Sequence, residues 1–504
     1  MSNEIYFRPP WTCGKYNADK RVAIMFNLLE DIDYFFEKEA ADVIGYVLAT
    51  EKGNAISVKN VSDLLQIAPI SINNFFNKLE NYGLLSFTPI TDAIVDEYRN
   101  ECKKKKHSEV NHNGPLEKES RTTAEDAYCK AVSEYDTITT VMFELTYRCS
   151  ESCIHCYNPG ATRNDSEKSK RGALKELTLE EYKRTIDELC DAGLVIAAIS
   201  GGDPFSYPHV WEILEYLYQK DVAIKLFTNG LRLNGNVNRL AKLYPRDVRI
   251  SVYSGIENIH DGITRVDNSL KKTLNTIEQL INQSIHVTIN CPVMTRNVQS
   301  YTTVKEIGKK YNTDIVFDYN ILDSMDGDVC ATRNLRLSQD QMEVILQDKD
   351  IGGYISKEIP ETLEGNKSNT ADGVPCEAGV SMFCIKPNGD LIPCCSLHLP
   401  FGNLKKNHLS AIFSNSDSLR KWKSMKISDF KECWKHDYCA YCDMCIGINY
   451  SEHKSPFVAG ENNCFIAKCK YDLVKKIKAN APLMQNIENN KDCDRELYRQ
   501  YRKG

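Results

Sequence analysis

The chain has 504 residues, with 26% charged and 42% hydrophobic residues and a formal net charge of −6. This length suggests two to four domains, and the composition is ordinary for a soluble globular protein. The acidic balance gives no support for nucleic acid or an anionic membrane as the main partner. Because the N-terminus lacks an apolar signal core and no run of 18 apolar residues occurs, we expect a cytoplasmic location. In a cytosolic chain, 20 cysteines indicate metal ligation rather than disulfides.

The first expected domain covers residues 1–98. Val22–Leu29 is an apolar run, and helical periodicity follows over Phe35–Leu48, Val58–Ile67 and Ile70–Leu85. This winged-helix-like pattern usually suggests DNA binding. However, residues 1–90 hold 8 Lys and Arg against 11 Asp and Glu, and the expected recognition helix carries only Lys78. Phosphate contacts need positive charge, so DNA binding is disfavoured. Two other roles for this domain, a structural cap or a dimerisation domain, stay open.

Residues 99–138 are expected to form a linker. They include four lysines at 103–106 and continue with HSEVNHNGPLEKESR, which shows no hydrophobic period. We expect this segment to be mobile or only partly helical, with the basic run simply solvated.

Strand-like and helix-like segments alternate over residues 139–348. Apolar runs typical of buried strands lie at 141–145, 194–199, 222–227, 248–253, 286–291 and 314–319. Helical patterns between them include Leu179–Ala192, Val210–Gln219, Ser269–Ile281 and Val304–Tyr311. Repeated βα units predict a parallel sheet, with the active site at the carboxyl ends of its strands.

The first of these strands leads into a loop with three cysteines, Cys149, Cys153 and Cys156. Their thiolates can converge on one metal centre, but the loop holds no fourth cysteine. A centre with three protein ligands and one open position is a reactive site, since structural sites normally close with four. The same spacing would also place three buried free thiols on one helix face. The following Pro159 and Gly160 favour a loop instead.

The C-x3-C-x2-C spacing directly after a strand, with His155 before the last cysteine, resembles the cluster loop of the radical S-adenosylmethionine (SAM) enzymes. The resemblance implies that Cys149, Cys153 and Cys156 hold a [4Fe–4S] cluster whose fourth iron is chelated by SAM. One electron from that cluster cleaves SAM to a 5′-deoxyadenosyl radical, which abstracts a hydrogen atom. The resemblance also implies a partial (β/α)6 TIM-like barrel over residues 139–348.

Two further loops resemble SAM-binding motifs of this family. Gly201, Gly202 and Asp203, in ISGGDP, resemble the GGEP motif that meets the SAM amino group, with Asp in place of the usual Glu. Glycines there let the backbone approach the ligand without an intervening side chain. Asn229 belongs to a Thr-Asn-Gly sequence that matches the family's TNG motif.

Residues later in the chain are candidates for binding the carboxylate and the ribose of SAM. Ser251 and Arg265 resemble positions that bind the SAM carboxylate, which a guanidinium can grip through two hydrogen bonds. Asn290 and Asn297 are candidates for the ribose.

Ten cysteines lie between Cys376 and Cys469. Asn388-Gly389 is expected to form a hairpin turn, and the order Cys376, Gly389, Cys394 resembles the opening of a SPASM domain. In this family that domain holds one or two auxiliary [4Fe–4S] clusters. We therefore expect a SPASM domain over 374–472, after a bridge at 349–373 and before a C-terminal helix and tail at 473–504.

The resemblance implies two auxiliary ligand sets that interleave along the chain. The first set is Cys376, Cys384, Cys394 and Cys464, and the second is Cys439, Cys442, Cys445 and Cys469. The second half departs from the family's spacing, and Cys395 or Cys433 can replace one of these ligands. Structural zinc is the alternative, because C-x2-C pairs also bind zinc.

Placed ahead of such a core, the N-terminal domain resembles a RiPP recognition element. RiPPs are ribosomally made, modified peptides, and this element binds the leader of the precursor as an added edge strand. The resemblance implies a maturase that abstracts a hydrogen from the precursor and closes a thioether or carbon–carbon crosslink. The expected partners are the leader-bearing precursor and an electron donor such as flavodoxin or ferredoxin, with no nucleic acid and no membrane.

Two alternatives stay open. The first is a protein-modifying maturase of the anaerobic sulfatase-maturase type. In those enzymes an Asp directly after the equivalent of Cys394 is the proposed base, whereas this chain has Cys395, which is a candidate catalytic residue. The second is an iron–sulfur redox-sensing regulator, which needs none of the SAM contacts at 201–204.

Overall fold

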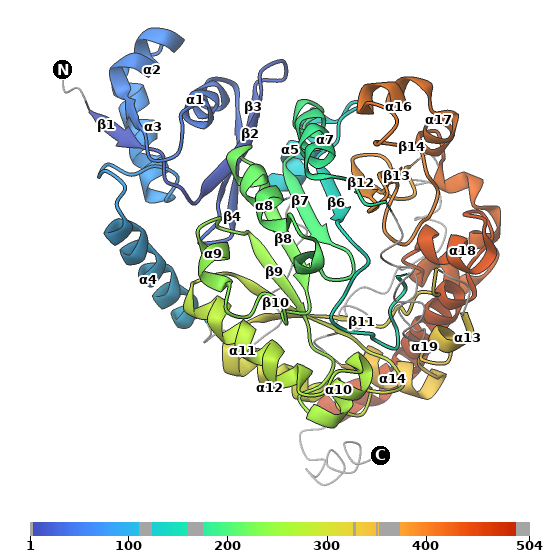
Figure 1. Ribbon diagram of the computed structural model, residues 1–504. Helices are drawn as coiled ribbons and strands as arrows, with labels where there is room; N and C mark the ends of the chain where they lie inside the picture. The colour runs from blue at the N-terminus through green and yellow to red at the C-terminus, as the bar shows by residue number, and fades with distance from the viewer. Residues whose placement is uncertain are drawn as a thin grey trace. The chain divides into compact units, whose positions relative to one another are not determined.

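The computed structural model describes residues 4–109, 123–158, 175–325, 329–348, 351 and 373–489. The chain divides into two compact units, which are described separately. The first unit comprises Met1–Arg336 and Cys376–Met425, and the second comprises Leu337–Pro375 and Lys426–Gly504. Figure 1 labels the elements of both.

A sheet of six consecutive parallel strands forms the centre of the first unit. The strands are β6 (Thr140–Glu144), β7 (Ile196–Ser200), β8 (Ala223–Thr228), β9 (Asp247–Ser251), β10 (Val287–Pro292) and β11 (Asp314–Asp318). They pair in chain order, each parallel to the next. The helices that follow the strands are α7 (Leu179–Asp191), α8 (Val210–Gln219), α9 (Val237–Ala241), α10 (Glu257–Thr264), α11 (Ser269–Asn282) and α12 (Thr302–Tyr311). The expected α/β fold with a parallel sheet is confirmed.

Part of the cysteine-rich region extends this sheet. Strand β12 (Met382–Ile385) pairs in parallel with β6 and antiparallel with β13 (Asp390–Ile392), which pairs with β14 (Gly402–Asn403). The expected hairpin turn lies between β12 and β13, and Gly389 has φ 89° there, in the region that favours glycine. Helices α16 (Leu409–Asn415) and α17 (Asp417–Lys423) follow. Because β12 joins the barrel sheet, residues 376–425 belong to the first unit, so the structure divides the region expected as one domain over 374–472.

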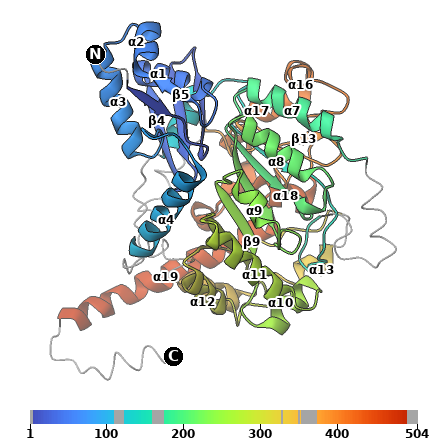
Figure 2. The ribbon, with the colours of Figure 1, turned by 60° about the vertical axis from the view of Figure 1, so that its left-hand side comes forward.

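The N-terminal domain combines two small sheets with the helices α1, α2 and α3 (Figure 2). Strands β2 (Thr12–Asn17), β3 (Val22–Asn27) and β4 (Ile32–Glu37) are antiparallel in that order, and β1 (Ile5–Phe7) pairs with β5 (Ala55–Ser57). The helices are α1 (Lys38–Ala49), α2 (Val58–Leu65) and α3 (Pro69–Asn81). The helix expected from Phe35 begins only at Lys38, because Phe35 and Phe36 belong to β4. The winged-helix assignment stays a prediction.

Strand β3 is buried along its whole length because both faces of its sheet are covered. Its side chains alternate between faces. Met25 packs in the core formed with the N-terminal helices, whereas Ile24 and Phe26 pack in a second core. That second core includes Ile196 and Ala223, the first residues of β7 and β8. The N-terminal domain therefore contacts the barrel at the amino ends of its strands.

Buried charge reinforces this contact. The Arg8 guanidinium, 1% exposed, donates to the carbonyl oxygens of Leu48 (2.8 Å) and Thr50 (2.7 Å) at the end of α1. It also lies 2.7 Å from the Asp221 carboxylate on the barrel, and Lys52 is 3.0 Å from the same carboxylate. Losing Asp221 would leave these two largely buried cations without their shared carboxylate, which is costly.

The segment expected as a linker contains two packed helices, α4 (Asp92–Glu109) and α5 (Ala124–Val132). Cys102 of α4 and Tyr128 and Val132 of α5 are buried in the core that joins the N-terminal domain to the barrel. These two helices agree with the expectation of a partly helical segment, and a few apolar residues per helix are enough to anchor them. The linker assignment itself stays a prediction. Residues 110–122 lie outside the described residues.

The second unit is mainly helical. It includes α14 (Gln339–Gln347), α18 (Ile446–His453), the long α19 (Glu461–Asn489) and three short turns, η2 (Ile427–Asp429), η3 (Lys431–Trp434) and η4 (Asp437–Tyr441). The C-terminal helix expected from 473 is the second half of α19. The side chain of Lys470 on α19 is 2% exposed and lies 2.6 Å from Asp443. Most of the expected bridge (352–372) and the tail beyond 489 lie outside the described residues.

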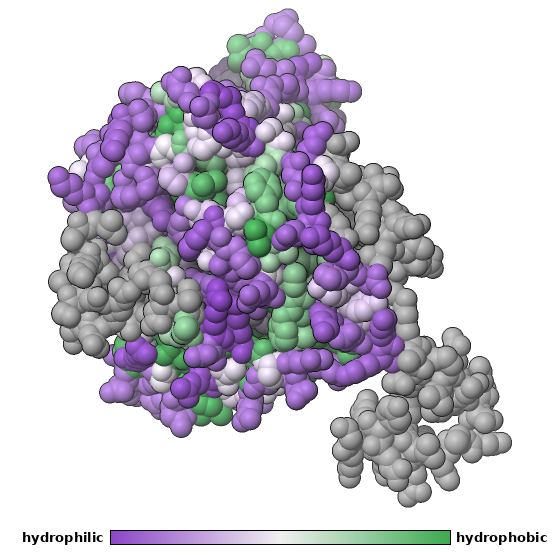
Figure 3. Space-filling model, turned by 90° about the vertical axis from the view of Figure 1, so that its right-hand side faces the viewer, coloured by the Kyte–Doolittle hydropathy of each residue, from purple (hydrophilic) through white to green (hydrophobic). Residues whose placement is uncertain are grey.

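The face in Figure 3 is mostly hydrophilic, with apolar residues scattered among polar ones. Among the described residues, none of the helices combines the length and the apolar character that a membrane span requires.

Candidate active site

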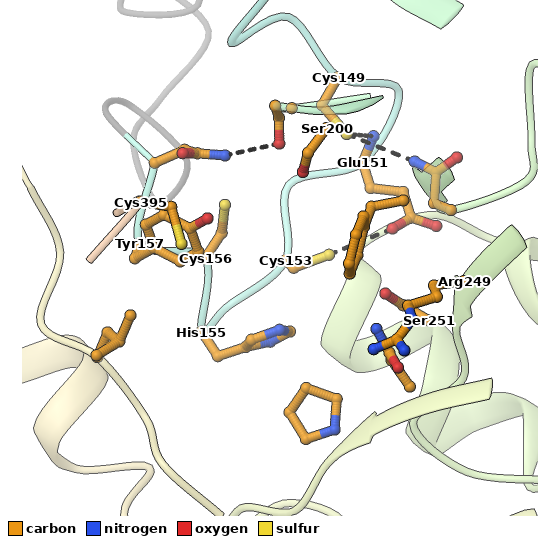
Figure 4. A pocket seen from close by; sticks show the side chains of 18 of the residues that line it. Cys149, Glu151, Cys153, His155, Cys156, Tyr157, Ser200, Arg249, Ser251 and Cys395 are labelled. Carbon is orange, nitrogen blue, oxygen red and sulfur yellow. Dashed lines mark hydrogen bonds between the residues drawn. The ribbon is translucent and has the colours of Figure 1, made fainter. Parts of the chain in front are cut away.

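A cavity of about 400 Å³ opens at the carboxyl ends of the barrel strands. Its walls come from the loop after β6, the loops after β7, β8 and β9, the ends of β10 and β11, and the segment after β13. Figure 4 shows Cys149, Cys153 and Cys156 around it, with Arg249 and Ser251 on another wall. The carboxyl ends of the strands are where sequence analysis expected the site.

Backbone hydrogen bonds hold the cysteine loop in place. The amides of Ser152 and Ile154 donate to the carbonyl oxygens of Thr264 and Ile263, both at 3.0 Å. These carbonyls belong to the last turn of α10, where helix carbonyls lack partners within the helix. The cysteine loop is thus fixed by hydrogen bonds to the end of α10, a contact that the sequence pattern did not predict.

All three cysteines of the loop line the cavity. The Cys149 sulfur accepts from the Glu151 amide (3.4 Å) and from Asn229 Nδ2 (3.5 Å). Cys153 Sγ lies 3.3 Å from Glu151 Oε2 and 3.7 Å from the Tyr253 hydroxyl. Burial raises the pKa of Cys149 to about 12, so this group is a thiol until a metal displaces its proton.

The donor set fits an iron–sulfur cluster. Three sulfurs face one cavity, and the backbone N–H of Glu151 and the side-chain amide of Asn229 can donate to sulfur there. Over the described ranges, no group of three Cys, His, Asp or Glu side chains is arranged to hold a single metal ion. The fit to a cluster therefore rests on the cavity and its three thiols.

Gly201 and Gly202 line the cavity, and the structure explains both glycines. A Cβ on Gly201 would lie 2.3 Å from the Thr146 carbonyl oxygen, and one on Gly202 would lie 2.5 Å from that of Arg148. Gly201 also has φ 128°. The close approach is to the backbone that leads into the cysteine loop, so these glycines are needed to pack the two loops together.

Asp203 does not line the cavity. It is fully buried, and its Oδ1 accepts a 2.6 Å hydrogen bond from Thr228 at the end of β8. Its Oδ2 has no hydrogen-bond partner among the described residues. Burial raises the pKa of this carboxyl to about 6. The expected contact of Asp203 with SAM stays a prediction, and its position behind the wall favours a supporting role.

The other expected SAM residues divide into two groups. Asn229, Ser251 and Asn290 line the cavity, and the buried Asn290 Oδ1 has no hydrogen-bond partner in the described ranges. Arg265 is instead an exposed residue that ends α10 with φ 57°, outside the cavity wall. Asn297 also lies away from the wall, where it bonds the Tyr253 and Pro292 carbonyls at 2.8 and 2.9 Å.

Arg249 is a cavity residue that sequence reasoning missed. It sits on β9 two residues before Ser251, and its Nε donates to Asp247 at 2.8 Å. Period-2 alternation places residues 249 and 251 on the same face of the strand, and this signal in the sequence could have found Arg249.

A second missed group surrounds Tyr157, which lines the cavity beside Cys395 (Figure 4). The Tyr157 hydroxyl lies 3.5 Å from Glu144, which also accepts from Tyr147 at 2.9 Å. Glu144 is fully buried, and burial raises its pKa to about 7. Cys395, the candidate catalytic residue, is thus placed on the cavity wall. Asp318, at the end of β11, lines it too.

In the second unit, four cysteines line one small pocket: Cys433, Cys439, Cys442 and Cys464. Burial raises the pKa of Cys433 and of Cys442 to about 11, and the neighbouring thiols add to the shift. This grouping differs from the interleaved sets inferred from sequence. Cys445 and Cys469 are absent from the lining of this pocket.

The remaining cysteines of the expected SPASM domain belong to the first unit. Cys384 on β12 is buried, and its pKa is raised well above the usual range, first by burial and then by Glu144, Cys395 and Cys394. Cys376 is exposed, and its sulfur accepts from the Ala378 amide at 3.4 Å.

Comparison with known proteins identifies two domains. Residues 143–305 match the radical SAM superfamily, and residues 376–446 match an iron–sulfur cluster-binding domain, SPASM. The antilisterial bacteriocin subtilosin biosynthesis protein AlbA of Bacillus subtilis is 27% identical over 65% of this chain and 70% of that protein. The AdoMet-dependent heme synthase of Methanosarcina barkeri is 24% identical over 61% of this chain and 90% of that protein.

Among solved structures, SuiB of Streptococcus suis bound to the precursor peptide SuiA superposes with a TM-score of 0.53. The match covers 91% of this chain and 99% of that one at 13% sequence identity. At this identity the likeness shows a shared fold.

Proposed function

We propose that this chain, in which residues 143–305 match the radical SAM superfamily and residues 376–446 match SPASM, matures a ribosomally made precursor peptide by closing an intramolecular crosslink. The observation that carries the proposal is the N-terminal domain: its edge strand β4 carries the apolar side chains of Ile32, Tyr34 and Phe36 on one face, in the same chain as a cavity lined by three cysteines. The relatives that act in bacteriocin biosynthesis or bind a precursor peptide support this reading.

A [4Fe–4S] cluster held by Cys149, Cys153 and Cys156, when bound, supplies the electron that cleaves SAM. Around it, the Arg249 guanidinium and the Ser251 hydroxyl are suited to hold the SAM carboxylate. The unpartnered Asn290 Oδ1 is suited to accept from a ribose hydroxyl.

The crosslink follows from hydrogen abstraction. SAM, when bound and cleaved, would supply a 5′-deoxyadenosyl radical able to take a hydrogen atom from a residue of the peptide, which would yield 5′-deoxyadenosine. The peptide radical then bonds to a second side chain, a thiol sulfur or a carbon, which gives up a proton. One electron must leave at closure, and the acceptor class is an auxiliary iron–sulfur cluster of the SPASM domain. Tyr157 and Cys395 lie on the cavity wall and would position the closing side chain. A flavodoxin or ferredoxin would supply the first electron.

The auxiliary cluster of the second unit is assigned to Cys433, Cys439, Cys442 and Cys464. This choice replaces the set inferred from sequence spacing, because these four thiols share one pocket. Cys376, Cys384 and Cys394 stay candidates for another cluster.

The leader would bind along β4, which is the edge strand of its sheet. Ile32, Tyr34 and Phe36 alternate with residues of the opposite face, so they share one side of the strand. Helix α3 and the residue after it contact the same face: the Phe36 ring centroid lies 5.9 Å from that of Phe75 in α3, and Tyr34 stacks on Tyr82 at 4.6 Å. An added strand would gain backbone hydrogen bonds from β4 and apolar contacts from this wall.

The charge of the N-terminal domain favours a peptide over nucleic acid as its binding partner. The first 90 residues carry more Asp and Glu than Lys and Arg, whereas phosphate contacts require cations. The sulfatase-maturase alternative would place a base at position 395, where this chain has a cysteine. A thiol is a weaker base than a carboxylate at neutral pH unless its pKa is lowered.

Point variants test the proposal better than deletion. Removing residues 1–98 would expose the core at Ile196 and Ala223 and damage the barrel itself. Ile32→Asp changes a side chain that is 41% exposed on β4, and Leu64→Asp is the matched control at a 65% exposed position of α2. The probe is a fluorescein-labelled peptide selected, from short peptides encoded in the same genome, for binding to the wild-type protein.

Ile32→Asp should weaken peptide binding in fluorescence anisotropy at least tenfold, while Leu64→Asp binds like the wild type. Both variants should cleave SAM without peptide at the wild-type rate, because the cavity lies at the opposite end of the barrel strands. Equal affinity of all three proteins would place leader recognition elsewhere. Mass spectrometry of the peptide after turnover tests the crosslink, which removes two hydrogen atoms.

A further inference from the structure

Tyr253 follows β9 and is fixed from several sides. Its ring centroid lies 5.0 Å from that of His155 and 5.3 Å from that of His260. Its backbone N–H donates to His260 Nδ1 at 3.2 Å, and its carbonyl accepts from Asn297 Nδ2 at 2.8 Å. The residue is 4% exposed. A tyrosine held this rigidly presents its hydroxyl to one small region of the cavity.

That region contains the sulfur of a cluster cysteine. The Tyr253 hydroxyl lies 3.7 Å from Cys153 Sγ, and Ser251 is its other hydrogen-bonding neighbour. Cys153 also faces Glu151 Oε2 at 3.3 Å, but an ionised carboxylate can only accept. Tyr253 carries an O–H group whether Glu151 is ionised or protonated. Of these two neighbours, Tyr253 is therefore the one that can always donate to Cys153.

We infer that Tyr253 donates an O–H···S hydrogen bond to Cys153 in the cluster-bound enzyme and thereby raises the reduction potential of the SAM-binding cluster. Reduction adds negative charge that spreads onto the ligating sulfurs. A donor at a sulfur therefore stabilises the reduced state more than the oxidised state, and hydrogen bonds to sulfur are among the factors that set cluster potentials. Tyr253 is in this sense a positioning and tuning residue. The inference rests on the radical SAM part of the proposed function and is independent of the peptide substrate.

The test compares midpoint potentials in the full-length protein after anaerobic reconstitution. The proteins are the wild type, Tyr253→Phe and a control, Tyr207→Phe. Tyr207 is a buried tyrosine whose hydroxyl donates to the Leu177 carbonyl at 2.7 Å, away from any cysteine. Redox titrations followed by electron paramagnetic resonance report the SAM-binding cluster, which is recognised because its signal changes when SAM is added.

Tyr253→Phe should titrate at a more negative potential than the wild type, and Tyr207→Phe at the same potential. A third protein carries 3-fluorotyrosine at position 253, whose more acidic phenol is a stronger donor. It should titrate at a more positive potential than the wild type. A purely structural role would not produce this order, because the fluorinated ring keeps the packing.

Equal midpoint potentials in the wild type, the Phe variant and the fluorotyrosine protein, each with full iron content, would overturn the inference. If the Phe variant fails to hold iron, the fluorotyrosine protein decides: a potential equal to the wild type overturns the inference, and a more positive one supports it. Failure of the proposed function would appear differently, as unaltered peptide in an enzyme that cleaves SAM.

Discussion

The Thr228 hydroxyl donates a 2.6 Å hydrogen bond to the buried carboxylate of Asp203. This bond joins the end of β8 to the loop after β7, so two loops of the cavity depend on one another. The bond also gives Asp203 Oδ1 a donor, whereas Asp203 Oδ2 has no hydrogen-bond partner among the described residues. The Asp203–Thr228 pair thus makes a buried charge tolerable close to the cysteine loop.

Replacing Thr228 by Val should therefore destabilise the protein by about 1–3 kcal/mol at pH 8, because a buried acceptor loses its donor. At pH 5 the loss should be smaller, since a carboxyl with a pKa of about 6 is then protonated. Denaturant unfolding of the metal-free protein at both pH values measures this. Thr228→Ser keeps the hydroxyl and serves as control, and a Val variant as stable as the wild type at pH 8 would contradict the prediction.

The buried carboxyl of Glu144 makes the stability of the fold depend on pH in a second way. Burial raises its folded-state pKa to about 7 from the ordinary 4.5, so the folded state binds a proton more tightly than the unfolded state. The stability from this proton is fully present below pH 4.5 and is lost as the pH rises through 7. For a shift of this size the loss is about 3 kcal/mol.

Glu144→Gln cannot lose that proton. Its stability relative to the wild type should therefore be higher at pH 8 than at pH 5, by up to about 3 kcal/mol. The exposed Glu257→Gln change is the control, and it should show no such trend. Parallel stability curves for the wild type and Glu144→Gln across this range would show that Glu144 is ionised in the fold at both ends.

Gly202→Ala should remove the SAM-binding cluster while sparing the auxiliary ones. Its Cβ would lie 2.5 Å from the Arg148 carbonyl oxygen, which forces the cysteine loop away from the wall. Iron content should fall by about four atoms per chain. Gly262→Ala is the control, because a Cβ on Gly262 meets no atom within 4 Å. Retention of wild-type iron and SAM cleavage by Gly202→Ala would contradict this account of the loop.

The auxiliary site of the second unit is tested by two matched cysteine variants. Cys433→Ser should lose about four irons per chain, because Cys433 lines the four-cysteine pocket. Cys469→Ser should keep them, because Cys469 is outside the lining of this pocket. Iron and sulfide analysis after reconstitution distinguishes the two. The opposite pattern would restore the ligand set inferred from sequence spacing.

Features that depend on a few consecutive residues could be predicted from the sequence. The strand before the cysteine loop, the glycine pair after β7 and the Asn388–Gly389 hairpin each follow from a few consecutive residues. Alternating βα segments also predicted the parallel sheet, because its strands occur in the sheet in chain order.

Features that depend on distant residues were not found. The four-cysteine pocket joins η3 and η4 to α19, and sequence spacing alone offered several groupings. The Tyr253–Cys153 contact joins residues 100 positions apart. Helix α4 was hidden by its lysines, although Cys102 anchors it to the core. Sequence patterns report which face of one element is apolar, but the partner that covers that face is set by the tertiary fold.

The central claim is that the radical formed in the cavity takes a hydrogen atom from a peptide. It is tested most directly with the peptide selected for binding to the wild-type protein, synthesised with deuterium at one type of residue at a time. After turnover of the reduced enzyme with SAM, mass spectrometry of 5′-deoxyadenosine should show deuterium from one residue type, together with a peptide that has lost two hydrogen atoms. If 5′-deoxyadenosine stays free of deuterium with every labelled peptide, and no peptide changes mass, the claim is contradicted.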